Sequence, residues 1–343
     1  MKVLVAMSGG VDSSVAAALL VEQGHDVTGA TMKLWGGSSD SGCCSVSDVE
    51  DARRVAAQIG IDHHVFNFSG EFQEKVVDSY VTAHQQGLTP NPCIECNRHL
   101  KFDTFLERAM VLGFDAIATG HHARIVMRGG RPYIARGEDR AKDQSYVLSM
   151  LTGRQLDRIL LPVGEITKDD VRQIAKGMSL RTALKPDSQE VCFITSDAGR
   201  DGFLASRIEL HPAELTERSS GRTLGSVPAV ELVTVGQRKG LGTLGDGAAR
   251  YAVEVDVRSR KVFLGRQSDL LVNRLIFTSA AFTYYSLDPG ERIEVQGSAH
   301  GRGAGAVYYP DMVELEEPCR RVAPGQTLAF YKDGMVVGSA MAC

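Results

Sequence analysis

The hydrophobic positions in the first half of the chain follow two alternating patterns. Residues 2–7 form a short apolar run typical of a buried strand, and residues 12–23 have the spacing of a helix that ends at Gly24. A capping box of Ser47 with Glu50 marks the start of another helix. The pattern predicts further strands at 27–34, 64–68 and 116–119 and further helices at 47–59, 71–86 and 98–112. Strands separated by helices favour a parallel sheet covered on both faces.

The pattern changes in the second half of the chain. Residues 125–136 are predicted to form a hairpin around Gly129 and Gly130, and helical spacing returns at 145–160 and again at 167–178, which starts at Thr167. After residue 205 the helical period fades, and short alternating runs occur at 230–235, 251–257, 261–264, 292–295 and 327–331. Glycine and proline separate these runs, which predict one or two small β domains.

Length and composition narrow the class of protein. A chain of 343 residues is expected to form two or three domains, and 43% hydrophobic with 23% charged residues is ordinary for a globular protein with a core. The net charge of -4 gives no overall basic field, so any RNA contact must come from a local patch. No apolar run is long enough to span a membrane or to form a signal peptide, which predicts a cytoplasmic protein. In that reducing compartment the seven cysteines favour catalysis or metal binding over disulfides.

The strongest chemical signal is the loop between the first predicted strand and the first predicted helix. Residues 8–14 read Ser-Gly-Gly-Val-Asp-Ser-Ser. A helix N-terminus presents unpaired backbone N–H groups and a partial positive charge, and glycines let the backbone approach an anion closely. The loop lacks the Gly-Lys-Ser/Thr ending of a Walker A motif and is not the Gly-x-Gly-x-x-Gly fingerprint. It therefore predicts a phosphate site of another kind.

This loop resembles the PP-loop of the ATP pyrophosphatases, which cleave ATP between the α and β phosphates and adenylate a substrate. The resemblance implies ATP as cofactor, with Mg²⁺ as the counter-ion of the leaving pyrophosphate, and Asp12 is a candidate to hold that ion. In a parallel sheet the nucleotide lies at the carboxyl ends of the strands. The candidate ATP residues are Ala6, Met7, Ser8, Gly9, Gly10, Val11, Asp12, Ser13, Met32 and Gly120.

A second chemical signal comes from two cysteine-containing segments. Residues 90–97 read PNPCIECN, and their two prolines predict an extended segment between two helices. Cys96 is expected to lie just before a helix that Asn97 caps, where the helix N-terminus would lower the pKa of the thiol. Cys192 lies in a second segment, KPDSQEVCFI, and meets Cys96 only if the fold brings them together.

Together with the loop, six segments resemble the tRNA-specific 2-thiouridylases in order and spacing: PNPCIECN, GHHAR, KDQSYVL, LPVGEITK, PDSQEVCFI and TVGQRKGLG. The resemblance covers nearly the whole chain and weakens after about residue 270. It predicts an α/β fold with a parallel-sheet PP-loop catalytic domain at 1–204, a small central β domain contacting tRNA at 205–267, and a barrel-like β domain at 268–343.

The resemblance also implies the reaction, a 2-thiolation of the wobble uridine of tRNA for lysine, glutamate and glutamine. ATP would adenylate the C2 oxygen, which turns a poor leaving group into a good one. Cys192 would carry a persulfide received from a cysteine desulfurase or a sulfur-relay protein. Cys96 would act as the nucleophile that releases the sulfur, or would resolve the product after direct attack on the base, and would end in a disulfide with Cys192.

One departure from the family concerns Cys93, because the family usually has aspartate at this place. Cys93, Cys96 and Cys192 are therefore also candidate ligands of an iron–sulfur cluster, since thiolates are the usual cluster ligands. A zinc site built on the single Cys-x-x-Cys is a weaker alternative without an obvious second pair. Cys43 and Cys44 add candidates, but a structural or redox role fits adjacent cysteines better.

The candidate RNA contacts form a local set. A basic stretch at 124–142 is suited to phosphates. Charge alone favours a solvated hairpin there, and the resemblance of residues 142–144 to a family segment that contacts tRNA favours RNA binding instead. By resemblance, the contacts to tRNA or to the target base are Asn91, Pro92, Cys93, His121, Lys142, Asp143, Gln144, Arg302 and Gln326. The aromatic residue that often follows the arginine in relatives is missing after Arg302, which weakens the predicted C-terminal contact.

Two other functions remain as hypotheses at this stage. A PP-loop synthetase that adenylates a small molecule would need neither Cys96 nor Cys192. An RNA-binding module held by a cysteine-bound metal would tolerate changes in the loop at 8–14, and it leaves that loop unexplained.

Overall fold

The structure is a computed structural model that describes residues 1–35, 45–187, 191–194, 199–243 and 247–343. Cys43 and Cys44 lie outside the described residues. The chain divides into two compact units. The first comprises residues 1–77, 92–197 and 333–337, and the second comprises residues 78–91, 198–332 and 338–343. The predicted domain limits at 204 and 267 stay a prediction.

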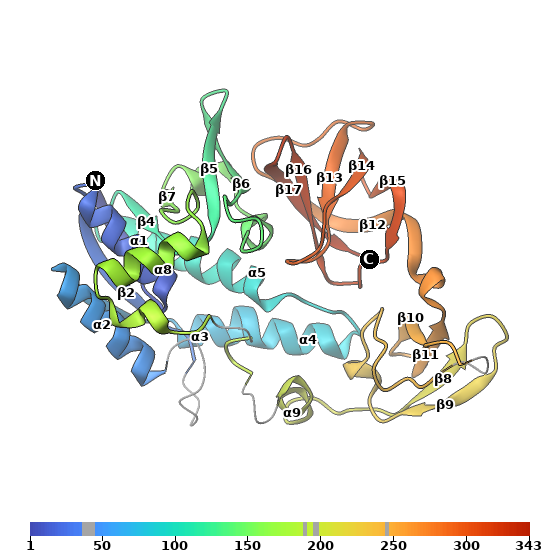
Figure 1. The fold of residues 1–343 in the computed structure, drawn as a ribbon. Helices are drawn as coiled ribbons and strands as arrows, with labels where there is room; N and C mark the ends of the chain where they lie inside the picture. Colours follow the sequence, from blue (N-terminus) through green and yellow to red (C-terminus); the bar gives the residue numbers. More distant parts are fainter. Residues whose placement is uncertain (36–44, 188–190, 195–198, 244–246) are drawn as a thin grey trace. The chain divides into compact units, whose positions relative to one another are not determined.

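A five-stranded parallel sheet forms the centre of the first unit (Figure 1). Its order is β3-β2-β1-β4-β7, with β1 (Lys2–Ala6), β2 (Asp26–Lys33), β3 (His63–Asn67), β4 (Ala116–Ala118) and β7 (Ile159–Leu160). Every neighbouring pair is parallel, as predicted. The edge strand β7 was not predicted, because the sequence predicts helical structure at 145–160. These residues form no single helix. They contain the 3₁₀ turn η3 (Ser145–Leu148), the short helix α7 (Gly153–Leu156) and β7.

Three helices cover one face of this sheet: α1 (Val11–Glu22), α2 (Val46–Ile59) and α8 (Lys168–Gly177). They meet the sheet in one apolar cluster that includes Val5, Val15, Val55 and Val171. Helix α8 begins after Thr167, as predicted. The predicted capping box of Ser47 with Glu50 is wrong. Ser45 caps α2 with Asp48, because the Ser45 hydroxyl accepts the Asp48 N–H at 3.1 Å, while Glu50 pairs with Arg54 at 2.8 Å.

Two helical runs follow β3 and lead to β4. The first comprises α3 (Ser69–Phe72), the π-helical η1 (Gln73–Asp78) and α4 (Ser79–Gln85), and the second comprises α5 (Pro92–Cys96), the π-helical η2 (Asn97–Thr104) and α6 (Phe105–Val111). The ring of Phe105 packs against Phe66 of β3 at 6.2 Å.

The second run begins earlier than predicted, because proline is well tolerated at the first helical position. Cys96 therefore ends α5 and leads directly into η2, so it lies inside the helical run and not before its start, and Cys93 occupies the first turn instead. Asn97 is no cap, since its side-chain amide donates to the Val147 carbonyl at 2.9 Å. The argument that a helix N-terminus lowers the pKa of Cys96 does not hold in this structure.

The predicted hairpin, which lies between β4 and η3 in the sequence, is confirmed. Strands β5 (Ala123–Arg128) and β6 (Arg131–Arg136) pair in antiparallel register around Gly129 and Gly130. Both glycines have positive φ, 58° and 76°, as a tight hairpin turn requires.

The second unit contains a small four-stranded sheet with the order β10-β11-β8-β9. Its strands are β8 (Ala213–Glu217), β9 (Thr223–Val227), β10 (Tyr251–Asp256) and β11 (Lys261–Gly265), and α9 (Gly199–Ala205) precedes them. Residues 230–235 were predicted to alternate as a strand. They form the 3₁₀ turn η5 (Val230–Leu232), which places Val230 and Val233 in the core of this sheet.

The C-terminal strands form a closed antiparallel barrel, in agreement with the predicted barrel-like fold. The order is β12-β15-β14-β13-β16-β17, and β12 also pairs with β17. The 3₁₀ turn η6 (Gln267–Leu270) leads into strands β12 (Leu271–Phe282), β13 (Arg292–Gln296), β14 (Ala304–Tyr309), β15 (Met312–Arg320), β16 (Thr327–Lys332) and β17 (Met335–Ala342). Among the described residues, no helix has the length and apolar character needed to cross a bilayer.

Candidate nucleotide and sulfur site

The loop between β1 and α1 has a conformation that its glycines and hydroxyl groups fix. Gly9 has φ 74°, and a Cβ there would lie 2.3 Å from the Asp48 carbonyl oxygen, so only glycine fits. Gly10 caps α1 without any side chain. The Ser13 hydroxyl accepts the Ser8 N–H at 3.2 Å and donates to the Gly10 carbonyl at 3.2 Å. Gly10 thus has no side chain that could accept backbone N–H groups in the first turn of α1. The start of this helix is therefore suited to bind an anion.

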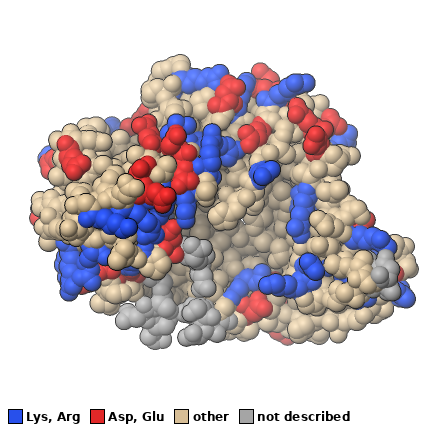
Figure 2. Space-filling model, viewed as in Figure 1, with Lys and Arg blue, Asp and Glu red and all other residues tan. Residues whose placement is uncertain are grey.

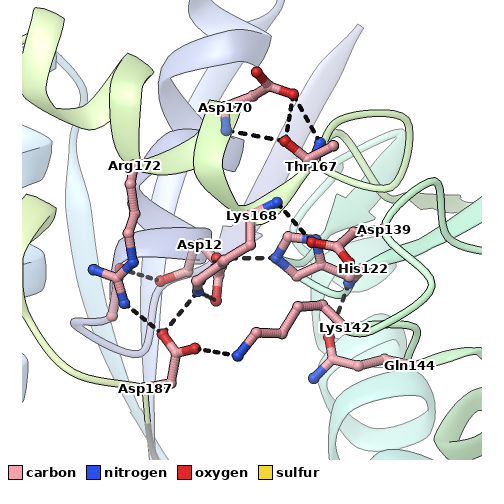
Figure 3. Close-up of polar contacts among 12 residues, drawn as sticks. Asp12, His122, Asp139, Lys142, Gln144, Thr167, Lys168, Asp170, Arg172 and Asp187 are labelled. Carbon is pink, nitrogen blue, oxygen red and sulfur yellow. Dashed lines mark hydrogen bonds and ion pairs between the residues drawn. The ribbon is translucent and has the colours of Figure 1, made fainter.

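A buried lysine binds the carboxylate at the start of α1 (Figure 3). The Lys168 Nζ donates to Asp12 Oδ1 at 2.6 Å and to Asp12 Oδ2 at 2.7 Å, and it lies 2.9 Å from Asp187 Oδ1. The His122 Nε2 lies 3.1 Å from Asp12 Oδ1. Only 9% of the Lys168 side chain is exposed, so its charge acts with little solvent screening. Lys168 thus joins the glycine loop to the segment that contains Asp187.

Asp187 is held by two more cations. Its Oδ2 accepts from Lys142 Nζ at 2.8 Å, and its Oδ1 accepts from Arg172 at 2.8 Å. Burial raises the pKa of Asp187, but the hydrogen bonds from Lys142 and Lys168 outweigh it and lower the pKa to about 2. Burial also opposes ionisation of Asp12, and the bonds from His122 and Lys168 outweigh it and lower its pKa. Both carboxylates are therefore ionised at neutral pH, beside three permanent cations.

A second lysine, Lys185, lies in the same segment as Asp187 and also binds the glycine loop. The Lys185 Nζ donates to the Gly9 carbonyl at 2.9 Å, to Asp48 at 2.6 Å and to Asp51 at 2.8 Å. Burial lowers the pKa of Lys185, but the two carboxylates outweigh it and raise the pKa. Lys185 follows the 3₁₀ turn η4 (Arg181–Leu184) and lies two residues before Asp187. Residues 185–187 are thus attached to the loop at two points, by Lys185 directly and by Asp187 through Lys168.

The carboxyl ends of the central strands lie against this loop. A Cβ on Gly120, which follows β4, would lie 2.6 Å from the Ser13 backbone nitrogen and 2.6 Å from the Asp12 carbonyl carbon. Met7 and Met32 are buried, and the Thr31 hydroxyl donates to the Met7 carbonyl at 2.7 Å. The close approach of Gly120 fixes the backbone from which Asp12 and Ser13 project.

The three predicted sulfur-site cysteines differ in exposure. Cys93 is exposed in the first turn of α5, and Cys96 is 7% exposed at the end of that helix. Cys192 is partly exposed in the described segment 191–194, next to Phe193, whose ring packs 5.7 Å from Phe72 and 6.3 Å from Trp35. Their roles in sulfur transfer stay predictions.

The residues predicted to contact tRNA near the hairpin are bound within the protein. Gln144 accepts the His122 N–H at 2.8 Å, and Asp143 accepts the Gly137 N–H at 2.9 Å. The His121 Nδ1 lies 2.7 Å from the Thr119 hydroxyl, and burial holds the pKa of His121 well below its usual value, so the ring is neutral. With Lys142 bound to Asp187, these side chains hold the loop after the hairpin in place, and their contacts to tRNA stay predictions.

The other predicted RNA contacts are spread over the second unit and the start of α5. Asn91 is partly buried, and Pro92 is the buried first residue of α5. Arg302 is exposed between β13 and β14. Gln326 is partly buried before β16, and its amide donates to the Thr89 carbonyl at 2.7 Å. As RNA contacts these residues also stay predictions.

The comparisons with known proteins agree on one family. Residues 1–196 match the family described as tRNA methyl transferase HUP domain, and residues 310–342 match the family described as aminomethyltransferase beta-barrel domain. The tRNA-specific 2-thiouridylase MnmA of Carboxydothermus hydrogenoformans is 43% identical over 357 residues, which cover 98% of this chain and 96% of that protein. This chain belongs to the tRNA-specific 2-thiouridylase family. The Mycobacterium leprae relative of the same name is 45% identical over 99% of this chain and 98% of its own length.

The thiouridylase site contains residues to which sequence reasoning gave no role. His122, Lys168, Lys185 and Asp187 lie in the segments GHHAR, LPVGEITK and KPDSQEVCFI, so the signal was present. The contacts of His122, Lys168 and Lys185 with the glycine loop span more than a hundred positions in sequence, since Asp12 and His122 are 110 positions apart and Asp12 and Lys168 are 156 positions apart. Sequence spacing alone therefore does not predict the contacts.

An iron–sulfur cluster does not fit the arrangement of these cysteines. Within the part of the chain that the structure describes, which includes Cys93, Cys96 and Cys192, no three or more His, Cys, Asp or Glu residues are grouped so as to hold a metal ion. We therefore derive no step through a cluster.

The basic stretch after the sheet is partly neutralised by acidic partners. Arg124 pairs with Glu138 at 3.6 Å and Arg128 with Asp333 at 2.6 Å. Basic and acidic side chains also lie interspersed over the face drawn in Figure 2. The stretch thus has a smaller net positive charge than its arginine content indicates.

We expect Gly120→Ala to raise the KM for ATP by tenfold or more, on the order of 1.4 kcal/mol or above in transition-state binding. The added methyl group would push against the backbone of Asp12 and Ser13 at 2.6 Å and displace the loop. Steady-state AMP formation at varied ATP measures the effect. The control is Gly177→Ala at the end of α8, where a Cβ meets no atom within 4 Å. An unchanged KM for Gly120→Ala would show that this approach does not shape the nucleotide site.

Proposed function

We propose that this protein uses ATP to adenylate the C2 oxygen of the wobble uridine of tRNA and replaces that oxygen with sulfur from a persulfide on Cys192. Its membership of the 2-thiouridylase family supports the uridine and the thiolation. The observation that carries the proposal is the ion-pair network of Asp12, Lys168 and Asp187, because it joins the phosphate loop to Asp187, which precedes Cys192 by five residues in sequence. The two half-reactions would thus share one set of contacts.

ATP is proposed to lie over the glycine loop. Backbone N–H groups from Gly9 to Ser13 and the hydroxyl of Ser8 would bind its phosphates, and Lys168 with Lys142 would neutralise their charge. Met32 and the strand ends Ala6 and Met7 would border the nucleoside. This arrangement has an excess of positive charge that can bind an anion, since three cations, Lys142, Lys168 and Arg172, face two carboxylates in the network.

The residues present also fit Mg²⁺. The Asp12 carboxylate is 31% exposed at the loop, and Mg²⁺ is commonly held by one or two carboxylates together with substrate phosphates and water. When bound, Mg²⁺ would supply charge neutralisation for the leaving pyrophosphate. Asp12 would hold the ion, and Lys168 would then be released from Asp12 toward the phosphates.

In the first half-reaction the uridine C2 oxygen attacks the α phosphorus of ATP, and pyrophosphate leaves. In the second, the sulfur reaches C2 and AMP leaves with the former carbonyl oxygen. On one route the Cys96 thiolate attacks Sγ of Cys192, releases hydrosulfide to attack C2 and forms the disulfide. On the other, the terminal sulfur of the persulfide attacks C2, and Cys96 then cleaves the S–S bond to the base. Either route leaves a Cys96–Cys192 disulfide for an external thiol to reduce.

The partners follow from this chemistry. The sulfur donor would be a cysteine desulfurase or a relay protein that delivers persulfide sulfur to Cys192. The substrates would be the tRNAs for lysine, glutamate and glutamine, whose contacts we assign to Asn91, Pro92, Cys93, His121, Lys142, Asp143, Gln144 and Arg302. Gln326 is not included, because its amide donates to the Thr89 carbonyl. The cytoplasmic location of the protein stays a prediction from the sequence.

Anaerobic purification followed by iron, sulfide and thiouridine assays tests this proposal. With tRNA labelled by oxygen-18 at uridine C2, the label is expected in AMP, and thiolation is expected from iron-free protein. If thiolation required iron and sulfide bound in a cluster, the persulfide scheme would fail. If the protein instead transferred AMP to a small molecule in the absence of tRNA, it would be a different adenylating synthetase.

A further inference from the structure

The short segment between α4 and α5 is held by its backbone. The Thr89 N–H donates to the Pro324 carbonyl at 2.7 Å, and the Thr89 carbonyl accepts from the Gln326 amide at 2.7 Å. Both polar backbone groups of this residue are therefore taken by the turn before β16. We call these two contacts the Thr89 bridge. All three residues belong to the second unit.

The turn that makes the Thr89 bridge is itself fixed to the barrel. Gly325 donates its N–H to the Ala342 carbonyl at 2.9 Å, and Ala342 donates back to the Gln326 carbonyl at 2.8 Å. Gly325 has φ 87°, and a Cβ there would lie 2.9 Å from Leu88 Cβ and 3.0 Å from the Thr89 nitrogen. Only glycine permits this approach without a shift of the turn or of the segment.

The same segment is also packed against the small four-stranded sheet of this unit. Gly87 has φ 74°, and a Cβ there would lie 2.6 Å from Cγ2 of Val257, in the turn between β10 and β11. The Leu88 N–H donates to the Ala83 carbonyl of α4 at 2.9 Å. Residues 87–89 are thus restrained by the helix before them, by the small sheet and by the barrel.

This restraint lies close in the chain to the sulfur site. Helix α5 begins at Pro92, three residues after Thr89, and carries Cys93 and Cys96. Pro90 and Pro92 each fix a φ angle and restrict the residue before them, so the backbone of the residues that lead into the helix has few conformations. On the far side of the cysteines, Asn97 donates to the Val147 carbonyl at 2.9 Å within the first unit. The Asn97 contact thus anchors the far end of the cysteine helix within the first unit.

We propose that Gln326 is a positioning residue for sulfur transfer, which acts on the Cys96 thiol through the Thr89 carbonyl and α5. This inference rests on the proposed function, in which Cys96 is the nucleophile. It differs from the contact to tRNA that the family resemblance implies for Gln326, because its amide donor is already bound to the protein. Loss of that donor leaves the Thr89 carbonyl without its partner and loosens the start of the cysteine helix.

Gln326→Met tests the proposal because methionine has a similar length and no donor. The single-turnover rate of thiolation at saturating ATP and tRNA is expected to fall by roughly tenfold to a hundredfold, the effect of a small misplacement of a reacting group. The affinity for tRNA and the rate of AMP formation are expected to remain at the wild-type values. In protein without tRNA, iodoacetamide is expected to alkylate Cys96 faster than in the wild type, with exposed Cys343 as internal reference in the mass spectrum.

Two further variants separate the Thr89 bridge from other effects. Gly325→Ala, which displaces Leu88 and Thr89 without changing the Gln326 side chain, is expected to reproduce the slower thiolation and the faster alkylation. Thr89→Ala keeps both backbone groups and is expected to behave as the wild type. Weaker tRNA binding by Gln326→Met, with saturating rate and alkylation unchanged, would overturn the proposal in favour of a tRNA contact. If the wild type does not thiolate tRNA, the proposed function fails, and the alkylation rates alone decide whether the bridge positions Cys96.

Discussion

Replacement of Lys168 by alanine is expected to lower the rate of AMP formation by roughly a hundredfold to a thousandfold, the scale found when a preorganised charge at a reacting group is removed. The Lys168 Nζ lies 2.6 Å from Asp12 and 2.9 Å from Asp187, in a side chain that is 9% exposed. Without it, two ionised carboxylates would face the phosphates of ATP, and their repulsion would be little screened. The thiolation rate is expected to fall with the rate of AMP formation, because adenylation precedes sulfur transfer in the proposed mechanism.

Pre-steady-state AMP formation with tRNA measures this effect, and Lys176→Ala provides the control. Lys176 lies on the same helix α8 but is exposed, so its removal is expected to leave the rate unchanged. Lys168→Arg keeps the charge with a different shape and is expected to retain part of the activity. Thermal denaturation checks that each variant folds. Adenylation at the wild-type rate by folded Lys168→Ala would show that Lys168 does not act in the nucleotide site.

The parts of this site that could be predicted from the sequence are those with local signals. The loop at 8–14 combines glycines, hydroxyls and a following helix within one short stretch, and the start of α8 is marked by Thr167. The contacts of Lys168 could not be predicted, because they depend on how α8 packs against α1 and η4 rather than on neighbours in sequence. The resemblance supplied the segments but not the partners within them.

The wrong local predictions have specific physical causes. Ser47 and Ser45 both offer a capping hydroxyl, and Ser45 is selected because Asp48 is in place to complete the reciprocal bonds. The prolines near Cys96 indicated an extended segment, yet proline also suits the first turn of a helix, and Pro92 has that position. Residues 230–235 alternate like a strand, but burial of Val230 and Val233 is achieved by a 3₁₀ turn.

Replacement of Cys192 by serine is expected to abolish thiouridine formation, a loss of more than about a thousandfold, while AMP formation persists. A serine hydroxyl cannot carry a persulfide, but it leaves the loop at 8–14 and the Asp12–Lys168 pair unchanged. Thiouridine in digested tRNA and AMP release are measured on the same samples. Cys343→Ser at the exposed C-terminal residue is the control and is expected to retain both activities. Thiouridine formed by Cys192→Ser at the wild-type rate would exclude Cys192 as sulfur carrier.

Cys96→Ser distinguishes the two routes of sulfur release, because each leaves a different trapped species when no reductant is present. If Cys96 must release hydrosulfide, the variant is expected to accumulate persulfide on Cys192, visible as one extra sulfur atom in the mass of the protein, and to leave tRNA unmodified. If the terminal sulfur attacks C2 directly, the variant is expected to stall as a disulfide between Cys192 and the base, a covalent protein–tRNA adduct that dithiothreitol cleaves to thiouridine. Adenylation should proceed in both cases, since the ion pairs of Lys168 with Asp12 and with Asp187 do not use the Cys96 side chain. A Cys96→Ser variant that completes thiolation without an added thiol would contradict both routes and would leave Cys93 as the thiol to test next.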